Sequence, residues 1–186
     1  MEIKEIKNDA ESRMKKAVEN TRSELAKIRT GKASPALLDG VKVPYYGSSV
    51  PLKQVASVNT PEPRLLTIQP WEKNLIGEIE KAIMKSDLGL NPVNDGILIR
   101  LPIPQLTEER RKDLVKVCHK IAEEGRIAVR NIRRDANESL KKTEKEHDIS
   151  EDQYHTAIDD IQQLTNKYIK EIDTVLKAKE NEVMEV

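Results

Sequence analysis

The chain has 186 residues, of which 37% are apolar, 34% are charged and 3% are aromatic, and its formal net charge is zero. A zero net charge excludes a uniformly basic nucleic-acid binder, and the shortage of aromatic rings leaves few platforms on which unpaired bases stack. The single cysteine excludes a disulfide framework, and no apolar run approaches the roughly 20 residues that span a bilayer, so we expect a cytoplasmic protein without a membrane partner.

The neutral total conceals basic and acidic segments. Residues 1–34 carry 9 Lys or Arg against 6 Asp or Glu, and residues 107–146 carry 12 against 9. Residues 147–186, in contrast, carry 4 against 10. The basic segments can therefore attract an anionic partner although the chain as a whole does not.

The distribution of helix breakers predicts the domain organisation. All nine prolines and six of the seven glycines lie between Gly31 and Pro104. Proline lacks a backbone donor and clashes with the preceding helical turn, so long helices are expected only outside this stretch. The sequence therefore predicts one helical domain formed by residues 1–30 and 106–186, with a second domain, residues 31–105, inserted into it.

The first segment is predicted to be one amphipathic helix that ends before Gly31. Apolar side chains recur every three or four residues, which places them on one face, and charged residues cover the rest. This predicted face comprises Ile3, Ile6, Ala10, Met14, Ala17, Thr21, Leu25 and Ile28.

The insert is predicted to be a small α+β domain with an aliphatic core. Lys73–Lys85 has the apolar spacing of a helix, and Asn94–Gly96 is typical of a hairpin turn because Asp-Gly readily accepts positive φ. Short runs rich in Val, Ile and Leu indicate strands. These runs are residues 41–43, 49–50, 55–58, 65–68 and 97–101.

Two further amphipathic helices are predicted after the insert. The first begins near Thr107 and continues to about residue 146, and its apolar face is Leu114, Cys118, Ile121, Gly125, Ala128, Ile132, Ala136 and Leu140. The second begins at Ser150, because Ser150 and Gln153 fit a capping box in which each side chain bonds the other residue's backbone amide. Its apolar face is Tyr154, Ile158, Ile161, Leu164, Tyr168, Ile172, Val175 and Lys179.

Three amphipathic helices bury their apolar faces most simply against one another, which predicts a three-helix bundle. Two chain segments join the insert to this bundle, and both contain residues that favour a bend. The expected fold is therefore of the α+β class: a long three-helix bundle carrying an inserted small mixed α/β domain, L-shaped and hinged.

The sequence contains no catalytic or metal-binding motif. It has no Gly-rich phosphate loop, and its three histidines are not spaced with each other or with the cysteine as zinc ligands are. Cys118 lies on a predicted apolar face, where a small core residue is expected. We therefore expect no catalytic residue, no metal and no cofactor.

A basic stripe on the second long helix is the strongest binding signal. Its residues recur every three or four positions on the side away from the apolar face, and Glu123 is the one acid among them. Such a charged face is commonly only solvated, but this excess of arginine favours binding of an anion such as RNA. The stripe comprises Lys112, Lys116, His119, Glu123, Arg126, Arg130 and Arg133, with Arg110 and Arg134 beside it.

Six blocks of the sequence resemble the ribosome recycling factor family, in family order and over the whole chain. They are residues 29–39, 43–47, 68–72, 86–96, 106–111 and 129–136. The resemblance implies a three-helix bundle with an inserted domain. It also implies that the chain acts with elongation factor G on the ribosome left after termination, splitting it into subunits while the partner uses the GTP.

The resemblance also implies roles for particular residues. Arginines of the bundle in this family contact the RNA of the large ribosomal subunit, and the matching positions are Arg29, Arg110, Arg130 and Arg133, to which the basic stripe adds Arg126 and Arg134. The hinge is expected at Gly31, Lys32, Ser34, Pro35, Pro104 and Gln105. We expect a monomer that binds the ribosome and elongation factor G but not DNA.

A second class of function also fits the helical pattern. A helical adaptor would use its apolar faces to bind partner helices, and it would self-associate through them. The proline-rich insert and the separately capped third helix weigh against this interpretation.

Overall fold

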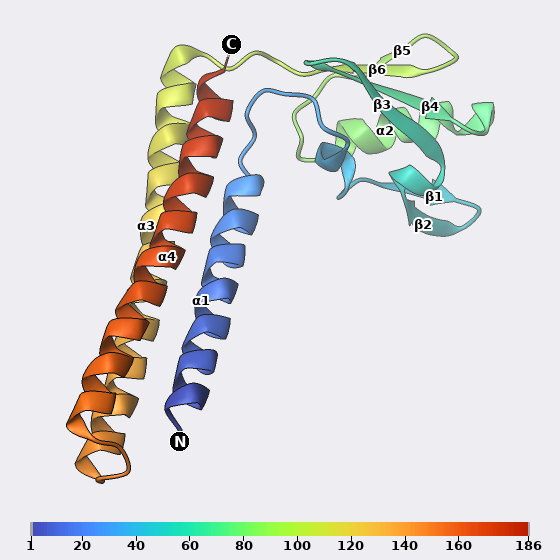
Figure 1. Ribbon diagram of the computed structural model, residues 1–186. Coiled ribbons are helices and arrows are strands. Elements are labelled where there is room, and N and C mark those ends of the chain that lie inside the picture. Colours follow the sequence, from blue (N-terminus) through green and yellow to red (C-terminus); the bar gives the residue numbers. More distant parts are fainter. Residues whose placement is uncertain (1, 186) are drawn as a thin grey trace. The chain divides into compact units, whose positions relative to one another are not determined.

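The structure is a computed structural model, and it describes residues 2–185 (Figure 1). Contacts divide the chain into two compact units. The helical unit is Met1–Thr30 with Glu108–Val186, and the inserted unit is Gly31–Thr107. The α+β class expected from the sequence is confirmed, because one unit consists of long helices and the other is built on β-strands.

The helical unit contains α1 (Ile3–Ala26), α3 (Glu108–Lys145) and α4 (Glu151–Met184). The three helices pack side by side, with α3 running antiparallel to the other two (Figure 1). The predicted capping box at the start of α4 is confirmed: the Ser150 side chain accepts from the Gln153 amide at 3.1 Å, and the Gln153 side chain accepts from the Ser150 amide at 2.9 Å. α3 has 38 residues, a rod of roughly 57 Å at about 1.5 Å per residue.

The turn from α3 to α4 is a Schellman motif. The amide of Asp148 donates to the Thr143 carbonyl at 3.2 Å, and the amide of His147 donates to the Glu144 carbonyl at 2.9 Å. His147 occupies the left-handed position of this motif with φ 59°. These bonds satisfy the last carbonyls of α3, so the connection can be as short as the sequence suggested.

The core of the bundle follows the predicted apolar faces with local shifts. In α1, Val18 is buried where Ala17 was expected. In α3, Ala122 and Val129 are buried, and Ile121 and Ala128, which were expected there, are only half-buried. Adjacent positions both satisfy the three-to-four spacing, and the direction in which the neighbouring helices lie decides between them.

Side chains of both other helices crowd Gly125 of α3. A Cβ added there would fall inside contact distance of the Thr21 hydroxyl in α1, and 3.3 Å from Cδ1 of Ile172 in α4. Thr21 is 3% exposed, and its hydroxyl donates to the Ala17 carbonyl at 3.0 Å. Gly125 therefore serves packing at this position, although glycine weakens the interior of a helix.

The inserted unit contains a two-stranded sheet, a four-stranded sheet and one helix. The small sheet pairs β1 (Lys42–Tyr45) with β2 (Ser48–Pro51), and α2 spans Ile76–Lys85. The larger sheet is antiparallel, in the order β3-β4-β6-β5. Its strands are β3 (Ala56–Glu62), β4 (Leu65–Pro70), β5 (Val93–Asn94) and β6 (Ile99–Pro102). Three short 3₁₀ helices, Pro35–Leu38, Leu52–Gln54 and Lys73–Leu75, complete the described elements.

The hairpin turn predicted at Asn94–Gly96 is confirmed. The Asp95 carboxylate accepts from the amides of Ile97 and Leu98 at 2.9 Å and from Arg100 at 2.6 Å. The two backbone bonds and the Arg100 contact lower the pKa of Asp95 to about 2. Leucine, isoleucine and valine from both sheets and from α2 form the core of the unit, which confirms the aliphatic packing expected from the composition.

No helix among the described residues is both long enough and apolar enough to cross a lipid bilayer.

Candidate RNA-binding surface

The outward face of α3 combines exposed cations and one apolar side chain with two exposed acids, Glu123 and Glu124. Five of its residues are exposed at helical spacings of three, four or seven, and Ile127 among them is 48% exposed. These residues are Lys116, Lys120, Ile127, Arg130 and Arg134. The combination presents positive charge and an apolar contact to whatever lies against this face.

Arg126 occupies a different environment from the one its spacing suggested. Its side chain is 19% exposed, and its guanidinium contacts Asp173 of α4 at 2.6 Å and Glu123 at 3.0 Å. Burial alone would lower the pKa of Arg126, but the bonds to both carboxylates raise it above its ordinary value. The expectation that Arg126 faces solvent with no acid but Glu123 nearby is therefore wrong, because α4 supplies a second carboxylate. Arg126 links α3 to α4.

Glu123 neutralises part of the stripe. Its carboxylate accepts from Arg126 at 3.0 Å and from Arg130 at 3.2 Å, and these bonds lower its pKa. The Arg130 side chain nevertheless remains 45% exposed. Arg130 can therefore turn toward an anion at the cost of one weak surface ion pair.

Arg133 is positioned by α4. Its guanidinium donates to the Gln162 side chain at 3.0 Å, and Gln162 in turn donates to Asn166 at 2.8 Å. A neutral amide fixes the direction of the guanidinium without cancelling its charge. An arginine held in this way loses less conformational entropy when it binds a phosphate.

The remaining predicted arginines are exposed. Arg134 lies on the outward face of α3 and has no hydrogen bond or ion pair with any described residue. Arg110 lies in the first turn of α3, and Arg29 follows the end of α1 by three residues. The helical unit thus carries all six predicted arginines: Arg29, Arg110, Arg130 and Arg134 are exposed, Arg133 is half-buried, and Arg126 is bonded to Asp173 and Glu123.

Lys120 and Ile127 belong to this surface but were not predicted from the sequence. Lys120, Ile127 and Arg134 each lie one residue after a member of the predicted stripe, and Arg130 is common to both sets. Their spacing of three, four or seven is a sequence signal for this surface once an apolar member is accepted.

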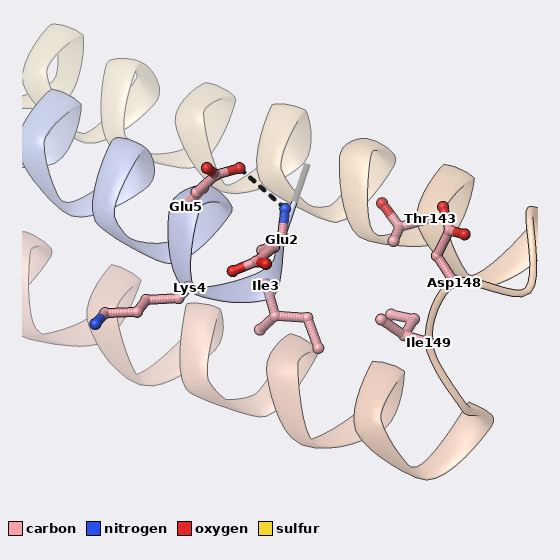
Figure 2. A pocket seen from close by; sticks show the side chains of 7 residues that line it. All are labelled: Glu2, Ile3, Lys4, Glu5, Thr143, Asp148 and Ile149. Atoms are coloured by element: carbon pink, nitrogen blue, oxygen red, sulfur yellow. Dashed lines mark hydrogen bonds between the residues drawn. The ribbon is translucent and has the colours of Figure 1, made fainter.

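An open hollow at the start of α1 does not suit RNA. It has a volume of about 460 Å³ and is lined by Glu2, Ile3, Lys4, Glu5, Thr143, Asp148 and Ile149 (Figure 2). The Glu2 amide donates to the Glu5 carboxylate at 3.0 Å as part of the helix cap. Three carboxylates against one ammonium group repel a phosphate backbone.

The two chain segments that join the inserted unit to the helical unit both bond to the turn between β3 and β4. The amide of Ala33 donates to the Pro63 carbonyl at 2.7 Å, and the amide of Ile103 donates to the Arg64 carbonyl at 2.8 Å. A Cβ added at Gly31, where φ is 79°, would lie 3.2 Å from Cγ of Leu106. The two segments therefore contact each other as well as the turn.

The bonds of Ala33 and Ile103 separate the predicted hinge residues into those inside the inserted unit and those nearer the helical unit. Ser34 and Pro35 begin a short 3₁₀ helix, in which the Ser34 hydroxyl accepts from the Ala36 amide at 3.3 Å. Lys32 and Pro104 lie outside the anchored stretch, and Gln105 follows Pro104. Bending at any of the six predicted hinge residues stays a prediction.

Residues 2–185 contain no group of three or more His, Cys, Asp or Glu side chains arranged to hold a metal ion. Cys118 is fully buried, which raises the pKa of its thiol. A buried thiol with a raised pKa is unsuited to nucleophilic chemistry, as its place on the apolar face indicated.

Comparison with known proteins agrees with the six sequence blocks. The family model described as "Ribosome recycling factor" matches residues 21–184. The ribosome-recycling factor of Syntrophomonas wolfei is 60% identical to this chain over 184 residues, which is 99% of this chain and 100% of the relative.

Two solved structures are similar over the whole chain. The solution structure of a ribosome recycling factor has 47% identity and a TM-score of 0.78, and the match covers 100% of this chain and 99% of that one. The second is the T. thermophilus ribosome recycling factor, described with E. coli elongation factor G bound to the E. coli post-termination complex. It has 49% identity and a TM-score of 0.64, and the match covers 99% of this chain and 100% of that one. The extent of these matches confirms the resemblance seen in the sequence: this chain belongs to the ribosome recycling factor family.

Proposed function

We propose that this chain is a translation factor that acts with elongation factor G and GTP to split the post-termination ribosome into subunits, releasing mRNA and tRNA. The observation that carries the proposal is the full-length similarity to the T. thermophilus factor, which is described with elongation factor G on the post-termination complex. We propose that this chain works in the cytoplasm, where bacterial ribosomes are found.

The exposed arginines of the helical unit are proposed to bind RNA of the large ribosomal subunit. Arg130 and Arg134 lie on the outward face of α3, and Arg133 is held in place by Gln162. Recognition of folded RNA through its phosphates needs guanidinium groups more than aromatic rings, which fits the composition of the chain. Arg29 and Arg110 are proposed as further contacts.

In this proposal the chain performs no chemistry. It binds as a monomer and transmits force, and elongation factor G consumes the GTP, so the chain itself needs no cofactor.

The adaptor interpretation has less support from the structure. An adaptor needs apolar helix faces that are open to a partner, but Met14, Cys118 and Ile161 on the three faces are fully buried within the unit. The faces of the helices are therefore already occupied by one another.

Light scattering of ribosomes tests the proposal. Post-termination ribosomes are mixed with the protein, elongation factor G and GTP, and each component is omitted in turn. We expect splitting only when all are present, slower splitting with the Arg130→Ala, Arg134→Ala double variant, and an unchanged rate with Arg22→Ala, an exposed arginine of α1. Ribosomes that stay intact with folded wild-type protein and an active translocase would overturn the proposal.

A further inference from the structure

Two of the six sequence blocks, residues 43–47 and 68–72, have no role in the proposed RNA contacts, and they meet in the inserted unit. The Tyr45 and Tyr46 hydroxyls each donate to one oxygen of the Glu72 carboxylate, both at 3.3 Å. The two tyrosine rings pack edge to face with their centroids 4.5 Å apart. Trp71 adjoins Glu72 in the chain, so three of the five aromatic residues of the protein lie in these two blocks.

Burial does not explain why the tip of this hairpin carries an aromatic ring. Tyr46 and Gly47 form the two-residue loop between β1 and β2, with φ of 46° and 81°. A loop with two positive φ angles favours Asn, Asp or Gly at its first position, and a bulky side chain is strained there. The Tyr46 side chain also gains little by burial, since the residue is 78% exposed. Strain that is retained without burial points to a function at this position.

Glu72 is a half-buried carboxylate without a cation. No Lys, Arg or His among residues 2–185 lies within ion-pair distance of it, and its hydrogen-bond partners are the two tyrosines. Burial raises the pKa of the Tyr45 hydroxyl and Glu72 raises it further, so this hydroxyl remains a donor at neutral pH. An ionised carboxylate has about four acceptor positions, and two remain open here.

The chemistry of these groups favours a cation and disfavours RNA. An aromatic face is electron-rich, and a carboxylate beside it adds negative charge to the same site. Arginine suits this pair better than lysine, because its planar guanidinium stacks on a ring while its N–H groups bond a carboxylate. A phosphate backbone would be repelled by Glu72.

We propose that Tyr46 and Glu72 form a docking point for an arginine of a partner protein, with the guanidinium stacked on the Tyr46 ring and paired with the Glu72 carboxylate. Trp71, the chain neighbour of Glu72, is 66% exposed. The proposal does not rest on the ribosomal function, because the site lies in the inserted unit and its test requires no ribosome.

The test is a titration of the full-length ¹⁵N-labelled protein, followed by NMR through the indole N–H of Trp71 and the backbone amides of Tyr46 and Gly47. Trp71 is the only tryptophan, so its indole signal is assigned without ambiguity. The probes are the end-blocked peptides Gly-Arg-Gly-Arg-Gly and Gly-Lys-Gly-Lys-Gly, and hexauridylate. We expect the arginine peptide to produce saturable shifts and to bind more tightly than the lysine peptide.

Two variants and a control separate the docking role from a structural one. Glu72→Gln keeps the shape and removes the charge, and Tyr46→Asn places a residue that favours positive φ in the loop, so the hairpin should stay folded. Each variant should lower the affinity for the arginine peptide by about 3- to 10-fold. This is the loss expected for one cation–π contact or one exposed charged hydrogen bond. Glu62→Gln, an exposed acid of β3, should bind as the wild type does.

Three results would overturn the proposal. They are an arginine peptide that produces no saturable shift in the wild type, equal affinity in wild type and Glu72→Gln, and shifts of these signals by hexauridylate but not by the peptide. The third result would identify the cluster as a stacking platform for RNA bases.

Discussion

Replacing Gly125 with alanine should destabilise the helical unit, although alanine is the better helix former. The new Cβ would fall inside contact distance of the Thr21 hydroxyl and would lie 3.3 Å from both Thr21 Cβ and Ile172 Cδ1. Rotation of the Thr21 side chain does not relieve the crowding, because it breaks the bond to the Ala17 carbonyl and leaves Thr21 Cβ 3.3 Å from the new atom. α1 must therefore move away from α3.

Two effects of opposite sign determine the magnitude. Overpacking a core costs about 1 to 3 kcal/mol, and the upper end applies here because a backbone must shift. The higher helix propensity of alanine stabilises the folded state by about 1 kcal/mol relative to glycine. We therefore expect Gly125→Ala to lower the free energy of unfolding of the helical unit by about 2 kcal/mol.

Urea unfolding followed by circular dichroism at 222 nm measures this change, since the long helices dominate that signal. Gly77→Ala in α2 is the matched control: nothing lies within 4 Å of its added Cβ, so it should stabilise the inserted unit by about 0.5 to 1 kcal/mol, read by Trp71 fluorescence. Adding Thr21→Ala to Gly125→Ala should recover most of the loss. A Gly125→Ala variant as stable as the wild type, or no recovery on adding Thr21→Ala, would contradict the predicted clash.

Three more predictions concern the connecting segment, the hairpin and the basic face. Gly31→Ala should cost about 1 kcal/mol of stability in the inserted unit, because φ of 79° is unfavourable for alanine; an unchanged urea midpoint by tryptophan fluorescence would contradict this. Asp95 has a folded pKa of about 2 against an ordinary 3.8, so the inserted unit should lose stability as pH falls from about 4 toward 2, and Asp95→Asn should show a smaller loss in unfolding curves taken at pH 5 and 2.5. Arg134→Ala should weaken ribosome binding and reduce the slope of log affinity against log salt by about 1. Arg126→Ala should instead lower the stability of the bundle by about 1 kcal/mol and leave that slope unchanged, and equal slopes for the two variants would refute the division between them.

The choice of buried residues in α3 illustrates a limit of helical periodicity. Ile121 and Ala128 fit the predicted face, yet their neighbours Ala122 and Val129 are the fully buried residues. Two sets of residues, one starting a single position after the other, both recur every three or four residues. The faces that they form differ by about 100° of rotation around the helix axis. Helices on two sides of α3 select the face that points between them.

The sequence by itself determined the long helices and five of the six strands, in their order. Proline and glycine confine the long helices to the two ends of the chain, a capping box marks the start of α4, and an Asp-Gly pair marks the β5–β6 turn. Each of these signals acts within a few residues through backbone geometry or a local hydrogen bond, so no distant partner is needed to interpret it.

The tertiary structure decided which charged groups are free to act. Arg126 and Arg134 are both predicted RNA contacts in the sequence. In the structure, α4 places Asp173, 47 positions after Arg126, against the Arg126 guanidinium, whereas Arg134 has no such partner among the described residues. The meeting of Tyr46 with Glu72, 26 positions apart, likewise depends on how β1 and β4 lie in the inserted unit. The charge and exposure of a side chain depend on neighbours that only the folded chain supplies, and periodicity carries no information about them.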